Sequence, residues 1–160
     1  AARAGSVAKD EVMERKRELD GTSMSAVARF TTMAASTGEE MLKKNVWAVV
    51  GNHGRNPVVE KLCDRLRSHG KTVFRVNPYG KPPAEYKSLT EIGAAVECVN
   101  LVVNPTMGLD VLDECEKLGI ASLFVQPGAG SDELRESASG KSIALHEGCV
   151  LVELPPSAAL

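Results

Sequence analysis

Short apolar runs alternate with amphipathic segments from about residue 45 onward. The apolar runs predict strands at 46–50, 72–76, 98–103, 121–125, 142–145 and 150–154. Between them, the apolar periodicity predicts a helix after residue 56, a short helix over 88–93, and helices over 107–119 and 131–139. Strands that alternate with helices through short loops form a parallel sheet with right-handed crossovers. The pattern therefore predicts an α/β, three-layer domain with a mainly parallel five- or six-stranded sheet, in which strands 46–50 and 72–76 are adjacent at the centre.

The first 38 residues have a different pattern. Residues 6–19 predict a charged helix that ends at Asp20-Gly21, and residues 23–35 predict a second helix. These helices carry too few large apolar residues for a core of their own. We therefore expect a helical N-terminal extension over 1–38, a domain over 39–154 and a C-terminal tail over 155–160. The extension is expected to contact protein partners or the outer helices of the domain.

Composition and charge exclude several classes of protein. The net charge of −2 offers no electrostatic attraction to nucleic acid or to a membrane surface. No apolar run approaches the roughly 18 residues of a membrane span. The four cysteines are scattered without a CxxC motif, so neither a zinc site nor a redox pair is predicted. Free cysteines suit a reducing intracellular compartment, either the cytoplasm or an organelle matrix (mitochondrion or plastid). The opening AARAGS agrees with the remnant of an organellar presequence.

The loop after the first strand is the first candidate for ligand chemistry. It reads Gly51-Asn52-His53-Gly54-Arg55-Asn56-Pro57. Asn56 suits the N-cap of the following helix and Pro57 its first position. Free N–H groups at such a helix start attract anions, Arg55 adds a positive charge, and His53 can donate to a phosphate. The alternative is a plain turn that uses glycine only to change the direction of the chain.

The loop after the second strand reads Asn77-Pro78-Tyr79-Gly80-Lys81. It has no acidic residue at the position where an NAD site usually binds the ribose hydroxyls. Lys81 instead offers a cation for a phosphate and Tyr79 a face for a base, unless Lys81 is simply a solvated loop residue.

Two later loops complete the candidate site. Asn104-Pro105-Thr106 precedes a helix that Thr106 can cap, and Gln126 and Gly128 can line the wall of a pocket. Asp132 and Glu133 open the next helix and would repel a phosphate, which favours the first glycine loop for that group. No catalytic set and no metal motif is predicted, because the three histidines are far apart and His53 has no evident carboxylate partner.

With these loops identified, residues 41–154 resemble the small CoA-binding proteins, which are Rossmann-like domains related to the N-terminal domain of the succinyl-CoA synthetase α subunit. The residues that carry the resemblance are Val49-Val50-Gly51, Val76-Asn77-Pro78, Tyr86-Lys87-Ser88-Leu89 with Ile92, Phe124-Val125-Gln126-Pro127-Gly128, and Cys149. The resemblance implies a CoA-sized ligand. It implies that the diphosphate lies on the first glycine loop and the adenine end lies near Asn77-Pro78.

The chain also departs from the family pattern. The first loop of the family reads like G-x-S-x-x-P-x-R-x-S, whereas this loop is about one residue shorter and lacks the serine; Asn52 and Arg55 are the candidate replacements. Phe124 stands where the family has tryptophan. The leading interpretation is a non-catalytic domain that binds CoA or an acyl-CoA. The alternatives are a structural or accessory subunit of a larger assembly, with or without ligand, and a nucleotide-dependent oxidoreductase.

Overall fold

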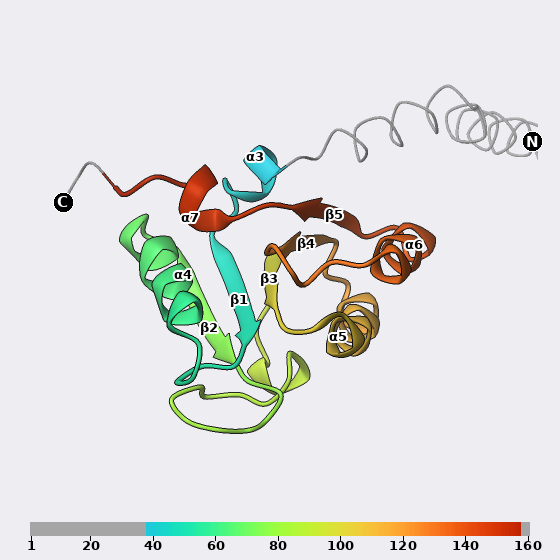
Figure 1. Ribbon diagram of the computed structural model, residues 1–160, viewed down its shortest axis with the longest axis horizontal. Coiled ribbons are helices and arrows are strands. Elements are labelled where there is room, and N and C mark those ends of the chain that lie inside the picture. The colour runs from blue at the N-terminus through green and yellow to red at the C-terminus, as the bar shows by residue number, and fades with distance from the viewer. Residues whose placement is uncertain (1–37, 158–160) are drawn as a thin grey trace, which may run out of the picture. The chain divides into compact units, whose positions relative to one another are not determined.

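The computed structural model describes residues 38–157 of the chain. The two predicted helices of the extension and the last three residues lie outside this range. The described elements, in chain order, are α3 (Gly38–Met41), β1 (Val46–Gly51), α4 (Pro57–Ser68), β2 (Thr72–Val76), the 3-10 helix η2 (Thr90–Ile92), β3 (Cys98–Val102), α5 (Pro105–Leu118), β4 (Ser122–Val125), α6 (Asp132–Gly140), β5 (Ala144–Glu147) and α7 (Val150–Glu153) (Figure 1).

The five strands form one parallel sheet in the order β2-β1-β3-β4-β5. This confirms the predicted α/β fold with a parallel five-stranded sheet. The first two strands are adjacent as predicted, with Val50 opposite Val76. Their predicted place at the centre is wrong, since β3 is central and β2 forms an edge. Because all strands are parallel, their carboxyl ends lie along one edge of the sheet.

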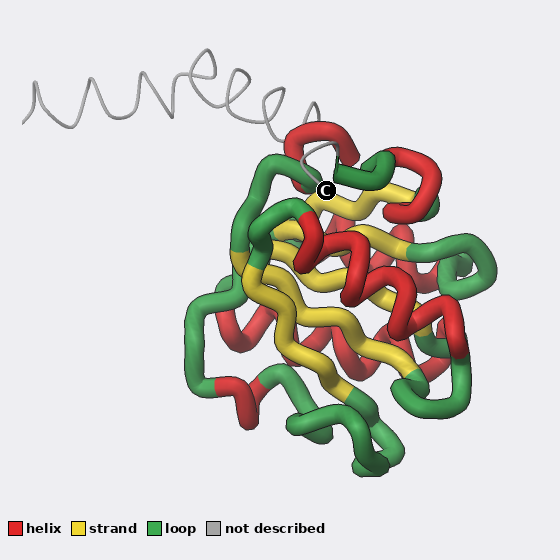
Figure 2. Tube along the Cα trace, turned by 90° about the vertical axis from the view of Figure 1, so that its left-hand side faces the viewer, coloured by secondary structure: helices red, strands yellow, loops and turns green. Residues whose placement is uncertain are grey.

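Helices cover both faces of the sheet, which lies between them as the middle layer (Figure 2). On one face, α4 and α7 pack over a core that contains Trp47 and Phe124, whose ring centroids lie 6.0 Å apart. On the other face, α5 and α6 pack over a core that contains Leu101 and Leu112. Strands buried on both faces must be apolar throughout, which explains the continuous apolar runs in the sequence. No helix among residues 38–157 is long and apolar enough to cross a membrane.

The C-terminal part of the sheet differs from the prediction. The strand predicted at 142–145 lies at 144–147, and the apolar run 150–154 forms helix α7 instead of a strand. The side-chain oxygen of Gln126 accepts a hydrogen bond from the Val150 amide (2.9 Å), which supports the start of this helical turn. Arg65 of α4 donates to the carbonyl oxygens of Leu151 (2.9 Å) and Leu154 (2.7 Å). Contacts that are distant in sequence therefore override the local strand preference of this run.

One buried amide in the centre of the sheet lacks hydrogen-bond partners. Asn100 of β3 is fully buried between Val49 of β1 and Phe124 of β4. Neither its side-chain nitrogen nor its side-chain oxygen has a partner among the described residues. A buried polar group without a partner costs about 1–3 kcal/mol of stability.

We expect Asn100→Val to raise the free energy of unfolding by about 1–3 kcal/mol, because an apolar β-branched side chain removes the unpaired amide and suits a strand. Urea unfolding followed by circular dichroism measures the change. Asn100→Ala is the control; it should gain less, since it leaves a cavity. A lower stability of the valine variant would show that the amide has a partner, such as a buried water molecule.

Glu97, just before β3, links the start of this strand to the start of its neighbour β1. Its carboxylate accepts hydrogen bonds from the backbone amides of Asn45 (2.8 Å) and Val46 (3.0 Å), and these bonds hold the pKa of Glu97 below its usual range. A carboxylate with a lowered pKa in the folded state adds stability above its unfolded pKa, about 4.3 for glutamate, and loses it as the pH falls.

We therefore expect Glu97→Gln to be less stable than the wild type at neutral pH, because an amide is a weaker acceptor than a carboxylate. The difference in melting temperature should shrink as the pH falls below about 4. Thermal unfolding at a series of pH values measures it. A difference that stays constant across this range would contradict a contribution from the charge.

Candidate ligand-binding site

Two neighbouring pockets lie where the strands end. A basic pocket of about 410 Å³ is lined by Asn52, His53, Gly54, Arg55, Tyr79, Lys81 and Pro82. An apolar pocket of about 250 Å³ is lined by Val50, Val76, Pro78, Lys87, Ser88, Leu89, Met107, Asp110, Val111 and Glu114. The loop after β2 connects the two, since Pro78 lines the apolar pocket and Tyr79 the basic one. This is the edge at which ligands bind in open parallel sheets.

Two glycines, Gly51 and Gly54, allow the backbone of the first loop to adopt its conformation. A Cβ at Gly51 would lie 2.9 Å from a methyl group of Val59, so only glycine lets α4 pack this closely on the end of β1. Gly54 has a φ of +88°, which favours glycine, and a Cβ there would lie 2.8 Å from Pro83. The loop then enters α4 with Asn56 as the N-cap and Pro57 in the first turn, as predicted.

The backbone amides of this loop already have acceptors inside the loop. The amides of His53, Arg55, Asn56 and Val59 donate to backbone carbonyl oxygens of residues 51–56. The Val58 amide donates to the side chain of Asn56, and the Gly54 amide donates to Glu60 (3.3 Å). The free N–H groups that the sequence suggests at this helix start are therefore largely occupied. An anion here must be held mainly by side chains.

The basic pocket supplies two such side chains. Arg55 and Lys81 are both exposed and line the same pocket, although they belong to loops after different strands. No acidic residue lines this pocket. Tyr79, whose exposed fraction is 53%, lines it as well and offers an aromatic face. Two cations beside an aromatic ring form a setting that suits a phosphate attached to a base or another planar group.

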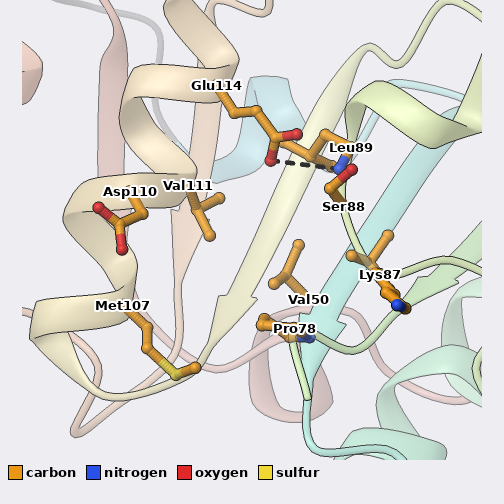
Figure 3. Close-up of a pocket in the computed structure, with 10 residues that line it drawn as sticks. Val50, Pro78, Lys87, Ser88, Leu89, Met107, Asp110, Val111 and Glu114 are labelled. Atoms are coloured by element: carbon orange, nitrogen blue, oxygen red, sulfur yellow. Dashed lines mark hydrogen bonds between the residues drawn. The ribbon is translucent and has the colours of Figure 1, made fainter. Parts of the chain in front are cut away.

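The neighbouring pocket has an apolar floor and a partly acidic rim. Figure 3 shows Val50 of β1 at its base, Met107 and Val111 of α5 on one side and Lys87 on the other. The rim residue Glu114 is already in use. It accepts hydrogen bonds from the amides of Leu89 (3.2 Å) and Thr90 (2.9 Å), which hold η2 against α5. The pocket therefore suits an uncharged group better than a phosphate.

His53 does not have the predicted role of a phosphate donor. Its ring is buried, with Nε2 2.9 Å from the carbonyl oxygen of Val49 and Nδ1 3.2 Å from a carboxylate oxygen of Glu60. Both ring nitrogens thus face inward, although the residue contributes to the wall of the basic pocket. The sequence also suggested that His53 has no carboxylate partner. This is wrong, because the first turn of α4 brings Glu60 back beneath the loop.

Asn77 is a buried connector between the first two loops. Its side-chain oxygen accepts from the Tyr79 amide (3.0 Å), and its nitrogen lies 3.4 Å from the Asn52 side-chain oxygen and 3.5 Å from the His53 carbonyl oxygen. The side chain is fully buried, and both of its polar atoms face other loop residues. Asn77 therefore positions the loops that line the basic pocket.

The predicted residues of the third and fourth loops have structural roles. Asn104, and not Thr106, is the N-cap of α5: its side chain accepts from the Met107 amide (2.9 Å), and Pro105 follows in the first turn. Buried Gln126 binds the Val150 amide, as described above. Neither these residues nor Gly128 lines either of the two pockets.

Most residues of the apolar pocket are not among the candidate residues that the sequence indicates. Met107, Val111 and Glu114 recur at helical spacing on the face of α5 that lies over the end of β1, so their periodicity was the available signal. Lys87 and Asp110 look like ordinary surface residues in the sequence. Only the folded chain shows that they flank a pocket.

The connector role of Asn77 can be tested by removing its side chain. We expect Asn77→Ala to lower the free energy of unfolding by about 1–3 kcal/mol, because the Tyr79 amide loses a buried acceptor. Urea unfolding measures the loss. Asn52→Ala is the matched control, since Asn52 is half-buried and its contact with Asn77 is long. Equal losses in the two variants would contradict a special role for Asn77.

Comparisons with known proteins agree with this architecture. A hypothetical protein from Pyrococcus horikoshii OT3 superposes with a TM-score of 0.65 at 22% identity, over 72% of this chain and 85% of the other. A conserved hypothetical protein from Pyrococcus furiosus gives 0.61 at 30% identity, over 69% and 99% of the two chains. The apo form of a dinucleotide-forming acetyl-coenzyme A synthetase 1 from Ca. Korarchaeum cryptofilum gives 0.50 at 18% identity, over 71% of this chain and 26% of that one.

No curated protein matches the chain in sequence. The family model described as a CoA binding domain, however, matches residues 45–155. This range contains the whole sheet, both pockets and the loops that the sequence singled out. It also covers more than half of the chain. The protein therefore belongs to the family of CoA binding domains.

Proposed function

We propose that this domain binds CoA or an acyl-CoA without catalysing a reaction on it. The observation that carries the proposal is the pairing of a basic pocket, with Arg55 and Lys81, and an adjoining apolar pocket at the carboxyl edge of the sheet. CoA has the same division into a phosphate-rich part and weakly polar parts. Membership of the CoA binding domain family supports the assignment.

The charges of the two pockets suggest how the ligand lies. The diphosphate belongs in the basic pocket, where two cations and no acids line the wall. Asp110 and Glu114 line the apolar pocket and would repel a phosphate, so an uncharged part of the ligand enters there. Pro78 lines this pocket, in keeping with an adenine end near Asn77-Pro78. Neither pocket alone exceeds the lower part of the usual range of ligand sites, about 300–1,000 Å³, so one CoA would need both.

The absence of a reactive pair supports a binding role. Among the described residues that line the two pockets, no serine or cysteine is hydrogen-bonded to a histidine. The Ser88 hydroxyl accepts from the Glu91 amide (3.4 Å), and the ring of His53 faces away from the pocket toward Val49 and Glu60. Covalent catalysis requires a nucleophile beside a base. An oxidoreductase role has less support, because the loop directly after β2, residues 77–81, has no acid for a ribose.

The occupied amides of the first loop favour a second candidate function. A loop whose N–H groups are satisfied internally keeps its shape without a ligand. Such a domain can serve as a structural or accessory subunit of a larger assembly even after it has lost affinity for CoA. The two functions differ in one measurable property, which is CoA binding by the purified chain.

We expect CoA to bind and to stabilise the protein by about 2.7 kcal/mol at 100 times its dissociation constant. Arg55→Ala and Lys81→Ala should each weaken binding by roughly 1–3 kcal/mol, or about 5- to 150-fold in Kd, because each removes a charge-assisted hydrogen bond to phosphate. Calorimetry measures the affinities. Lys117→Ala is the control: Lys117 is exposed in the last turn of α5 and lines neither pocket.

Related ligands separate the candidate functions. Dephospho-CoA should bind nearly as well as CoA if the diphosphate is the group held, whereas pantetheine should bind far more weakly. Acetyl-CoA incubated with the protein should release no free thiol beyond the rate in buffer. Binding of NAD in place of CoA would favour the oxidoreductase. Failure of every CoA species to bind would favour the structural subunit.

A further inference from the structure

Three side chains with metal-binding atoms meet behind the first glycine loop. They are His53 in the loop and Glu60 and Cys63 in α4, and their ligand atoms all lie within 4.8 Å of one another. Glu60 and Cys63 are three residues apart, so they lie on the same face of the helix. His53 and Cys63 are buried, whereas the Glu60 side chain is 35% exposed. The cluster is therefore enclosed by protein except on the side of Glu60.

The hydrogen bonds of His53 bring two acceptor atoms, its Nδ1 and a carboxylate oxygen of Glu60, close together without a donor between them. A carbonyl oxygen only accepts, so the proton of a neutral His53 ring lies on Nε2, which bonds the Val49 carbonyl oxygen at 2.9 Å. Nδ1 then presents a lone pair to the Glu60 carboxylate, whose oxygen lies 3.2 Å away and also only accepts. Two acceptors at this distance need a positive species between them. Histidines that bind metals commonly donate their other N–H to a backbone carbonyl, as His53 does.

The Glu60 carboxylate is not closely paired with the neighbouring arginine, so it can bind a cation. Its nearest positive group is Arg75, whose Nη1 lies 3.8 Å from a carboxylate oxygen of Glu60. Arg75 has a closer partner in Glu85, which accepts from both its Nε and its Nη2. The guanidinium charge is thus already matched, and Glu60 contributes a further negative charge to the cluster. The Gly54 amide is its other donor, at 3.3 Å.

We propose that His53 Nδ1, a carboxylate oxygen of Glu60 and Cys63 Sγ bind a zinc-class divalent metal ion, with water as the fourth ligand. Tetrahedral zinc with Zn–N and Zn–O bonds of about 2.0–2.2 Å places those two ligand atoms roughly 3.4 Å apart, close to the observed distance. The sulfur lies within 4.8 Å of the other two ligand atoms, so it must move inward by at most roughly 1 Å to reach a Zn–S bond of about 2.3 Å. One thiolate and one imidazole favour zinc or cobalt over magnesium or calcium.

Binding displaces one proton. Burial raises the pKa of the Cys63 thiol to about 12, so the thiol is protonated without a metal. When the ion binds, the S–H bond breaks, the electron pair forms the metal–sulfur bond, and the proton goes to solvent. Neither oxidant nor reductant is needed. The ion would join the loop to α4 from behind, independently of any ligand in the pockets.

The test uses the full chain, reduced, freed of metal with a chelator and titrated with Co²⁺. We expect a thiolate-to-cobalt charge-transfer absorption that saturates at one ion per chain and disappears when Zn²⁺ is added. Cys63→Ala should abolish this absorption. Cys115→Ala is the matched control, because Cys115 is buried in the core on the opposite face of the sheet and should leave the absorption unchanged. Absence of the absorption in the wild type, or its persistence in Cys63→Ala, would overturn the proposal.

Nitrogen NMR of the histidine rings in the wild type gives a second measurement that does not depend on a variant folding. Stoichiometric Zn²⁺ should shift Nδ1 of His53 to the range of metal-bound nitrogen and leave Nε2 protonated. A His53 ring that carries protons on both nitrogens in the presence of Zn²⁺ would show that a proton fills the gap. That result would also overturn the proposal.

Discussion

Parallel pairing of β1 with β2 on one side and β3 on the other is the constraint on which the rest of the structure depends. It requires the chain to leave β1 for one face of the sheet, through α4, and to leave β3 for the other face, through α5. The two connections diverge at the carboxyl ends of the strands, where the sheet cannot be covered by either helix. Both pockets lie at this divergence.

The two pockets offer a ligand different interactions: the basic pocket offers positive charge and the apolar pocket offers an apolar surface. Two loops from different strands bring their cations to one wall, while α5 and the ends of β1 and β2 supply an apolar floor. The backbone amides of the first loop already have acceptors within the protein, so the electrostatic attraction for an anion comes from Arg55 and Lys81. A site built in this way depends on a few side chains, and its affinity can change greatly without any change in the fold.

Sequence patterns predicted the sheet well because fully buried parallel strands must be apolar on both faces, and few other arrangements produce such runs. The N-cap of α4 could also be predicted, since Asn56 and Pro57 suit the cap and the first position of a helix whatever the rest of the chain does. Asn104, and not Thr106, caps α5 because it directly precedes the helix and its side chain reaches the amide of Met107, the third helical residue. The strand expected at 150–154 became a helix through Gln126 and Arg65, which are distant in sequence. Likewise, the burial of Asn77 and the meeting of His53 with Glu60 depend on how loops fold back, which spacing alone does not reveal.

The hydrogen bonds that fasten the C-terminal segment have an evolutionary consequence. Arg65 binds the carbonyl oxygens of Leu151 and Leu154, and His69 approaches that of Pro155 at 2.6 Å. Every residue type provides a carbonyl oxygen, so these bonds place no restriction on which amino acids follow one another there. For these hydrogen bonds the restriction falls on Arg65 of α4 and on His69, the residue that follows the helix. Across homologues, substitutions should accumulate at the exposed position 155 and stay apolar at 151, which packs against the core, while arginine persists at 65. The side chain on which this contact depends therefore lies far in sequence from the segment that it holds.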